Sequence, residues 1–230
     1  MKTIGLIGGM SWESTVTYYQ IVNEFVKEKL GGFHSAKVLL YSVDFAEFEK
    51  NMGNSDWDKI TQDLTDAAQN LEKAGADFIL VCTNTMHKVV PEIQKKVSVP
   101  IIHIADATAE KLKEHQITKV ALLGTKYTMT QNFIRDKLTE AGIEVVTPNE
   151  NEIELVNDII FNELCLGVVS EQSREKYSHI IDEMAEQGAQ GVILGCTEIG
   201  LLIEQKDSSL PVFDTTVIHA SKAAMMSIED

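Results

Sequence analysis

Apolar residues occur along the chain in short continuous runs, separated by longer stretches that mix apolar and polar positions. The runs are rich in Val, Ile and Leu and do not alternate with polar residues, as is typical of parallel strands covered on both faces. We therefore predict strands at Thr3–Ile7, Lys37–Val43, Asp77–Cys82, Val99–His103, Lys119–Leu123, Ile143–Val146, Gly191–Gly195 and Pro211–Asp214.

The stretches between these runs carry a helical pattern. Trp57–Lys73 and Ser173–Gln187 have apolar residues three and four positions apart, and each is followed by a glycine, Gly75 or Gly188. Glycine commonly ends a helix because it adopts the left-handed backbone conformation without strain. Alternating strands and helices indicate an α/β fold with right-handed crossovers.

The chain contains an internal repeat. The segment GADFILVCTNT, beginning at Gly75, aligns without a gap with GAQGVILGCTE, beginning at Gly188, and this register places Thr83 opposite Cys196. Segments on either side agree in the same order, since VPIIH resembles LPVFD and TIGLIGG resembles KVALLGT. A general likeness among parallel strands explains any one match, but a matched series indicates two related structural units.

We accordingly predict two pseudo-symmetric lobes, each a mainly parallel sheet flanked by helices. The first lobe is expected to comprise residues 1–105 plus 208–230, and the second residues 106–207. Ligands of parallel sheets bind beyond the carboxyl ends of the strands. The active site is therefore expected in the cleft between the lobes.

Four loops are expected at this cleft: GGMSWE from Gly8, TNTMH from Thr83, GTKYT from Gly124 and CTEIG from Cys196. They are rich in small polar residues and lead into helical segments, whose free N–H groups bind carboxylates or phosphates. A simpler interpretation is that Thr83, Asn84, Thr85 and Thr197 only cap helices.

Charge and composition narrow the class of function. The formal net charge of −15 argues against nucleic-acid binding, which needs a basic surface. An anionic substrate is still compatible, because helix N-termini can hold a carboxylate without Lys or Arg. No apolar run approaches the roughly 20 residues that span a bilayer, and the N-terminal segment reads as a buried strand and its loop. We expect a cytoplasmic protein without a membrane partner.

The three cysteines suggest a free thiol with a possible chemical role, and neither a disulfide framework nor a metal site. Cys82, Cys165 and Cys196 are few and far apart, and no C-x-x-C or His spacing suggests a metal. Neither GxGxxG nor a P-loop occurs, so no dinucleotide cofactor is indicated. Cys196 ends a buried strand before a helix whose dipole would favour the thiolate, although a structural cysteine is the simpler interpretation.

The other two cysteines are expected in the core. Side chains of a strand alternate, so Cys82 points away from Thr83 and is expected to pack beneath the sheet. Cys165 follows an apolar helical pattern. A cysteine hydrolase using Cys82 and His87 is a weaker alternative, because no third catalytic partner is evident. Acid/base groups on two sides of a carboxylate-binding pocket suit racemisation, which needs a base on one face of a stereocentre and an acid on the other.

The motifs LIGGMSWEST at Leu6, CTNTMH at Cys82, HIADAT at His103, LLGTKYTM at Leu122 and ILGCTEIG at Ile193 resemble those of the aspartate/glutamate racemase superfamily. The resemblance covers nearly the whole chain, and GCTE with GGM is more similar to the aspartate-racemase branch. It implies a two-base mechanism with one cysteine from each lobe, no PLP, no metal, a small acidic amino acid as substrate and a homodimer.

The resemblance also implies roles for individual residues. Cys196 matches the second catalytic cysteine, the base for the L-enantiomer, while Thr83 stands where the first cysteine is usual. Thr83 would be a poor base, because a hydroxyl holds its proton far more tightly than a thiol of pKa about 8.5. L-substrates are therefore expected to react better than D-substrates.

The same resemblance assigns supporting roles to residues near Cys196 and Thr83. Met10, Asn84, Thr85 and Thr197 are expected to contact the substrate, with Glu198 and His87 behind them. The segment ELCLG lacks the basic residue that aspartate racemases commonly carry there. That leaves Lys50, by its position, as a candidate for the contact with the side-chain carboxylate of the substrate. Two alternatives stay open: an isomerase or decarboxylase of small diacids with the same fold, and a non-catalytic protein that binds acidic amino acids.

Overall fold

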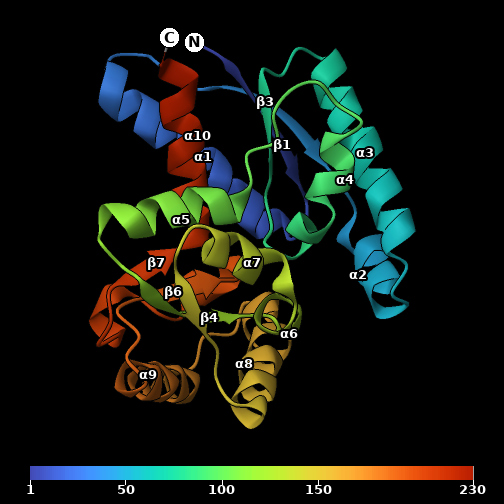
Figure 1. Cartoon of the computed structure of the whole chain (residues 1–230). Coiled ribbons are helices and arrows are strands. Elements are labelled where there is room, and N and C mark those ends of the chain that lie inside the picture. The colour runs from blue at the N-terminus through green and yellow to red at the C-terminus, as the bar shows by residue number, and fades with distance from the viewer. Residues whose placement is uncertain (230) are drawn as a thin grey trace. The chain divides into compact units, whose positions relative to one another are not determined.

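The structure is a computed structural model that describes residues 1–229, in two compact units (Figure 1). Unit 1 comprises residues 1–104 together with the described residues from His219 onward, and unit 2 comprises Ala105–Ile218. The two ends of the chain meet in unit 1, where the Lys2 backbone N–H donates to the Ser227 carbonyl over 2.8 Å.

Unit 1 is built on a parallel sheet of three strands in the order β2-β1-β3. These are β1 (Thr3–Gly8), β2 (Lys37–Ser42) and β3 (Phe78–Val81). β1 is almost wholly buried, whereas most of β2 is exposed because it forms the edge of the sheet.

Helices cover both faces of this sheet (Figure 1). Ile4 and Leu6 of β1 pack with α1 and α10 on one face, and Ile7 packs with α3 on the other. The helical segments that complete unit 1 are α1 (Trp12–Leu30), α2 (Phe45–Gly53), α3 (Trp57–Lys73), η1 (Thr85–Lys88), α4 (Val90–Gln94) and most of α10 (Thr215–Ile228).

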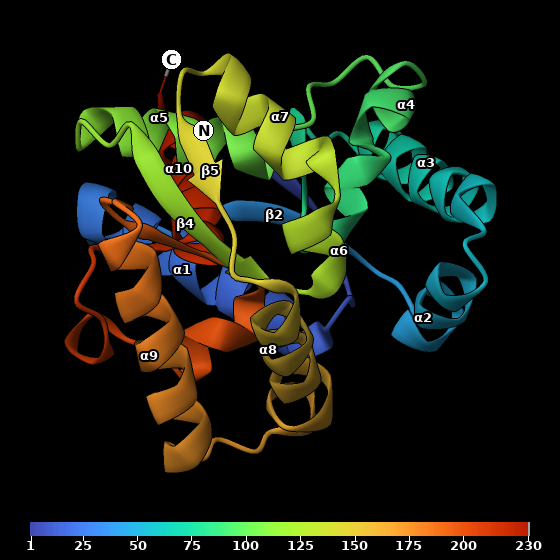
Figure 2. The same cartoon turned by 60° about the horizontal axis from the view of Figure 1, so that its bottom comes forward.

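Unit 2 repeats this plan with strand order β5-β4-β6-β7, again parallel. Its strands are β4 (Lys119–Gly124), β5 (Glu144–Val146), β6 (Val192–Gly195) and β7 (Val212–Asp214). α8 and α9 pack on one face, while α5 and α7 lie on the other (Figure 2). The helical segments are α5 (Ile104–Glu114), α6 (Lys126–Thr130), α7 (Asn132–Glu140), α8 (Glu150–Asn162), η2 (Leu164–Leu166), α9 (Glu171–Glu186), η3 (Thr197–Leu201) and η4 (Gln205–Asp207).

The predicted fold class, two parallel sheets flanked by helices, is confirmed, and α3 occupies the predicted helical range. One predicted strand is wrong. Val99–His103 contributes a single bridge, between Ile101 and Ile79, since Pro100 has no N–H to donate and α5 begins directly after His103.

The chain returns to the first unit later than expected. We expected residues 208–230 in the first lobe, but β7 pairs with β6, and the backbone enters unit 1 only at His219, within α10. The reason is hydrogen bonding, because the backbone groups of β7 find their partners on β6.

Among residues 1–229, none of the helices has the length and apolar character that crossing a bilayer requires.

Candidate functional site

In unit 1 the loops that follow β1 and β3 are neighbours, because Ile7 pairs with Val81 at the ends of these strands. Gly9 has a φ of 92°, and a Cβ atom there would lie 2.2 Å from the Val43 carbonyl oxygen, so only glycine fits. Its N–H donates to Thr15 Oγ1 over 2.8 Å, and Ser14 Oγ donates to the Cys82 carbonyl over 3.4 Å. Both loops are therefore tied to the first turn of α1.

The predicted substrate contacts of unit 1 lie in these two loops. Met10 is buried in the first loop, and in the second Thr83 is partly exposed while Asn84 and Thr85 are buried. η1 has no side-chain cap, so these polar residues do not serve as caps at its start.

Cys82 is wholly buried on the α1 face of the sheet, among Tyr18, Leu80 and Ala220. Burial in these apolar surroundings raises the pKa of its thiol far above the ordinary range. Cys82 therefore lies beneath the sheet, where the alternation of strand side chains predicted it.

Three buried histidines lie behind the Thr83 loop. The ring centroid of His87 lies 4.7 Å from that of His103 and 5.6 Å from that of His219. His87 Nδ1 donates to the Thr83 carbonyl over 2.8 Å, and this bond holds the backbone of Thr83, the residue matched to Cys196. Its Nε2 atom is buried and has no hydrogen-bond partner among the described residues.

The tautomers and charges of two of these rings follow from their partners. A carbonyl only accepts, so His87 carries its proton on Nδ1, and His219 carries its proton on Nε2, 2.8 Å from the Ile102 carbonyl. His219 Nδ1 then accepts from the Tyr18 hydroxyl over 2.9 Å. Burial, followed by repulsion from a neighbouring histidine, lowers the pKa of His87 well below its usual value and that of His219 to about 3. Both rings are neutral at pH 7.

In unit 2 the three consecutive residues Cys196, Thr197 and Glu198 form one hydrogen-bonded group at the end of β6. Cys196 Sγ donates to Glu198 Oε2 over 3.0 Å, and Thr197 Oγ1 donates to the same oxygen over 2.6 Å. Glu198 is buried, and Cys196 is partly exposed. The thiol is thus oriented by a carboxylate that follows it by two positions.

The electrostatics at Cys196 differ from the sequence-based expectation of a stabilised thiolate. Burial, together with the negative charge and hydrogen bond of Glu198, raises the pKa of the Cys196 thiol well above its usual value. η3, which follows, is a 3₁₀ segment of five residues without a side-chain cap, so the expected dipole of an α-helix is missing. The resting group is the neutral thiol.

Two further sequence-based assignments can be compared with the structure. Cys165 lies exposed in η2, so its expected place in the core is wrong, because the helix α8 ends before it at Asn162. Lys50 lies exposed on α2. Among residues 1–229, no three His, Cys, Asp or Glu side chains are grouped so as to hold a metal ion.

Sequence reasoning missed Tyr18, Ser14 and His219 as residues that support the loops. His219 lies 201 positions from its partner Tyr18, and no local motif links two residues so far apart. Only the HIADAT and CTNTMH motifs, which contain His103 and His87, drew attention to this cluster.

Comparison with known proteins identifies the family. Residues 7–223 match the family model described as Asp/Glu/Hydantoin racemase. A proposed Asp/Glu racemase from Yersinia pestis is 54% identical with a TM-score of 0.95, and both chains are covered completely. The chain belongs to the Asp/Glu/hydantoin racemase family. An aspartate racemase homologue from Pyrococcus horikoshii OT3 is 41% identical over the full length of both chains, with a TM-score of 0.88.

A curated relative in this family has a named activity. The broad specificity amino-acid racemase RacX of Bacillus subtilis (strain 168) is 25% identical over 224 residues, which cover 94% of each chain. Family membership thus rests on matches along nearly the whole chain and on both units of the fold.

Proposed function

We propose that the protein is a PLP-independent racemase of acidic amino acids, aspartate or glutamate, with Cys196 and Thr83 as its acid/base groups. The observation that carries the proposal is the Cys196 thiol, hydrogen-bonded to Glu198 at a strand end, in a chain of the Asp/Glu/hydantoin racemase family. Cytoplasmic location and assembly as a homodimer belong to the same proposal.

In this mechanism the Cys196 proton first passes to the carboxylate that already accepts its hydrogen bond. The resulting thiolate takes the α-proton of an L-amino acid, and a planar carbanion forms. A proton then reaches the opposite face of the carbanion from water, through the Thr83 hydroxyl, which gives the D-enantiomer. The hydroxide left behind is neutralised by the proton that Glu198 releases to solvent, so Cys196 ends as the thiol and Glu198 as the carboxylate. Every proton removed is replaced, so no external oxidant or reductant is needed.

The remaining residues have supporting roles in this proposal. Met10, Asn84, Thr85 and Thr197 contact the substrate, and His87 acts through the Thr83 backbone that it holds. Because Thr83 is a far weaker acid and base than a thiol, L-substrates are favoured in initial rates.

Hydrogen exchange in deuterated water tests the proposal. L-aspartate or L-glutamate recovered from an incubation with the enzyme is expected to carry deuterium at the α-carbon. Cys196→Ala is expected to lower this exchange at least a hundredfold while the far-ultraviolet circular dichroism stays unchanged. Cys82→Ala is the matched control, because it removes a buried thiol of unit 1 with little loss of exchange.

Three other results would contradict the proposal. Release of carbon dioxide from a malonate, or conversion of maleate to fumarate, without α-deuterium would indicate a decarboxylase or isomerase of diacids. Saturable binding of L-aspartate without any exchange would indicate a binding protein. Equal loss of exchange in the two alanine variants would remove the special role of Cys196.

A further inference from the structure

Two of the three cysteines lie in the same part of unit 2. Cys165 belongs to η2 and is exposed, and Cys196 is the partly exposed residue that precedes η3. η2 packs against η3, although α9 and β6 lie between these segments in the sequence. The fold therefore brings together two thiols that no local motif connects.

The two segments share one apolar core. Leu164, the residue before Cys165, is buried in the same cluster as Ile199 of η3. Cys196 packs against that cluster from the end of β6. Because Leu164 and Ile199 anchor η2 and η3 in one core, the two thiols stay neighbours in the folded chain.

The charges of both thiols act on the same surroundings. Burial is the largest cause that raises the pKa of the Tyr177 hydroxyl, and the negative charges of Cys196, Glu163 and Cys165 raise that pKa further. Burial and the Glu198 carboxylate raise the pKa of Cys196, and the charge of Cys165 adds to them. Coulomb energy falls with distance, so these interactions agree with the packing of η2 on η3.

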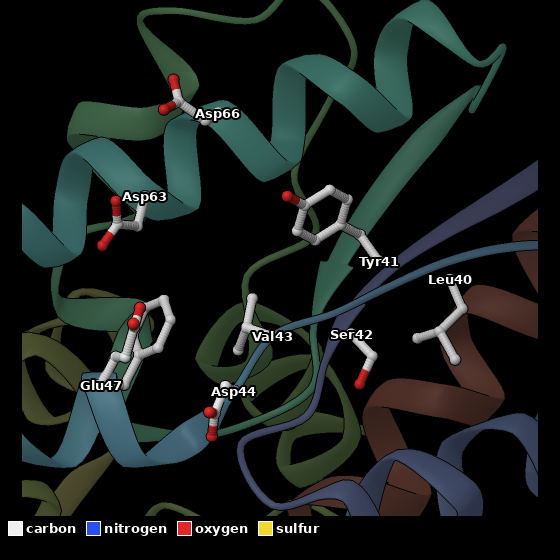
Figure 3. A pocket seen from close by; sticks show the side chains of 9 residues that line it. Leu40, Tyr41, Ser42, Val43, Asp44, Glu47, Asp63 and Asp66 are labelled. Carbon is white, nitrogen blue, oxygen red and sulfur yellow. The ribbon is translucent and has the colours of Figure 1, made fainter.

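Unit 1 offers no comparable pair of thiols. Its one cysteine, Cys82, is wholly buried. A pocket of about 460 Å³ lies between β2, α2 and α3, with carboxylates such as Asp44 and Glu47 in its lining (Figure 3). None of its lining residues within 1–229 is a cysteine, so a small oxidant that enters this pocket meets no thiol.

We propose that Cys165 and Cys196 form a reversible oxidation site, at which a peroxide converts the two thiols into a disulfide. The thiol of Cys165 reacts first, because susceptibility to oxidation follows exposure. Its sulfur attacks an oxygen of hydrogen peroxide and the O–O bond breaks. The products are the sulfenic acid of Cys165 and a water molecule.

Cys196 completes the reaction. Its sulfur attacks the sulfenic sulfur of Cys165, so that an S–S bond forms and the S–O bond breaks. The proton of Cys196 passes to Glu198, whose Oε2 already accepts it over 3.0 Å, and then to the leaving hydroxide, which becomes water. Together the thiols lose two electrons and two protons, and the peroxide is reduced to water. A dithiol reductant reverses the change by thiol–disulfide exchange.

The disulfide occupies the thiol that serves as a base in the proposed function. Exchange of the α-proton is therefore expected to stop while the bond persists and to return on reduction. This consequence rests on the proposed function, whereas formation of the bond does not. Reversible disulfides of this kind act as redox sensors in compartments that otherwise keep thiols reduced.

Peptide mapping of the full chain tests the bond. The reduced protein is treated with a small excess of hydrogen peroxide, blocked with iodoacetamide and digested with trypsin without reduction. Cleavage after Arg174 and Lys176 puts Cys165 and Cys196 on separate peptides. The two peptides are expected to be linked, lighter by two hydrogen atoms than their sum, and to separate in dithiothreitol.

Two variants show which thiols are needed. Cys165→Ser is expected to form no link and to keep at least tenfold more α-proton exchange after peroxide than the wild type, because the neutral thiol of Cys196 is a poor nucleophile by itself. Cys82→Ala is the matched control, since it removes the buried thiol of unit 1 and is expected to form the link as the wild type does.

The proposal is overturned if Cys165 and Cys196 stay unlinked after peroxide, whether unchanged or oxidised further to sulfinic acids. A link between Cys165 residues of two chains, seen as a covalent dimer on non-reducing electrophoresis, would also overturn it. Exchange measured on the same samples separates the two proposals. A linked protein whose reduced form never exchanges contradicts only the racemase, and an exchanging enzyme without the link contradicts only the disulfide.

Discussion

At the scale of single residues, the thiol of Cys196 is governed by its neighbour Glu198. The carboxylate both accepts the thiol proton and raises the pKa of the thiol through its negative charge. Glu198→Gln removes the charge, so the pKa of Cys196 is expected to fall, while burial, the larger cause, keeps it above the ordinary value. The measurement is the pH dependence of iodoacetamide alkylation at Cys196, followed by mass spectrometry.

The exposed thiol of Cys165 serves as an internal reference in that experiment. An alkylation curve for Cys196 that stays in place or moves to higher pH would contradict the role of the Glu198 charge. Exchange of the α-proton is expected to slow in the same variant, because the amide of Gln cannot take up the thiol proton.

The neutral histidines make unit 1 sensitive to acid. The pKa of His219 is about 3 in the folded protein and about 6.5 when unfolded, so the unfolded state binds more protons between these values. Stability is therefore full above pH 6.5 and falls as the pH drops toward 3. Between pH 7 and pH 5 this residue alone accounts for a loss of about 2 kcal/mol.

Urea unfolding at pH 7 and pH 5 measures this loss. Both tryptophans, Trp12 and Trp57, lie in unit 1, so their fluorescence reports on the unit that contains His219. His219→Gln is expected to be less stable at pH 7, because it disturbs the bonds to Tyr18 and Ile102, but to lose less between the two pH values. An unchanged difference would mean that the acid sensitivity has another source.

At the scale of elements, the turn after β1 depends on Gly9. Both Gly9 and Gly75 have positive φ, 92° and 96°, but only Gly9 lacks room for a Cβ atom. Gly75→Ala is expected to cost about 1 kcal/mol through backbone strain alone. Gly9→Ala is expected to cost at least about 3 kcal/mol, because the loop must also move away from Val43.

Thermal unfolding of the two variants measures the difference. Movement of this loop also displaces Met10, so α-proton exchange is expected to fall in Gly9→Ala and to persist in Gly75→Ala. Equal unfolding midpoints would show that the loop relaxes without cost and that the close approach to Val43 is unimportant.

At the scale of the whole molecule, the two repeated units differ in the residue they offer at the matched position, Thr83 in unit 1 and Cys196 in unit 2. In deuterated water, the wild type is expected to bring deuterium into recovered L-substrate faster than it forms D-product. Thr83→Cys is expected to raise D-product formation toward the rate of exchange, because a second thiol is restored. The ratio of the two rates is measured by chiral chromatography with mass spectrometry.

The equilibrium constant between enantiomers is one, so the ratio of kcat/KM in the two directions must equal one for any complete racemase. An imbalance in initial rates can therefore appear in kcat at saturating substrate, or in exchange without turnover, but not in kcat/KM or in the equilibrium. If Thr83→Cys left the ratio unchanged and Cys82→Ala abolished D-product formation, Thr83 would have no part in the reaction.

Local pattern was sufficient for much of the fold. Continuous apolar runs predicted the strands of both sheets, and the repeat around Gly75 and Gly188 predicted two units with one plan. The alternation of successive side chains along a strand predicted that Cys82 lies beneath the sheet. These features depend on neighbours within a few residues, which is the range over which hydrophobic periodicity and backbone preference act.

Tertiary structure decided the features that join distant segments. Whether Pro211–Asp214 belongs to the first or the second unit depended on which strand edge accepts its hydrogen bonds, and β6 does. The same holds for His219, which meets Tyr18 and His87 only after folding, and for the state of the Cys196 thiol. A sequence specifies which groups are present, but burial and the charges of neighbours set their pKa values, and both exist only in the folded chain.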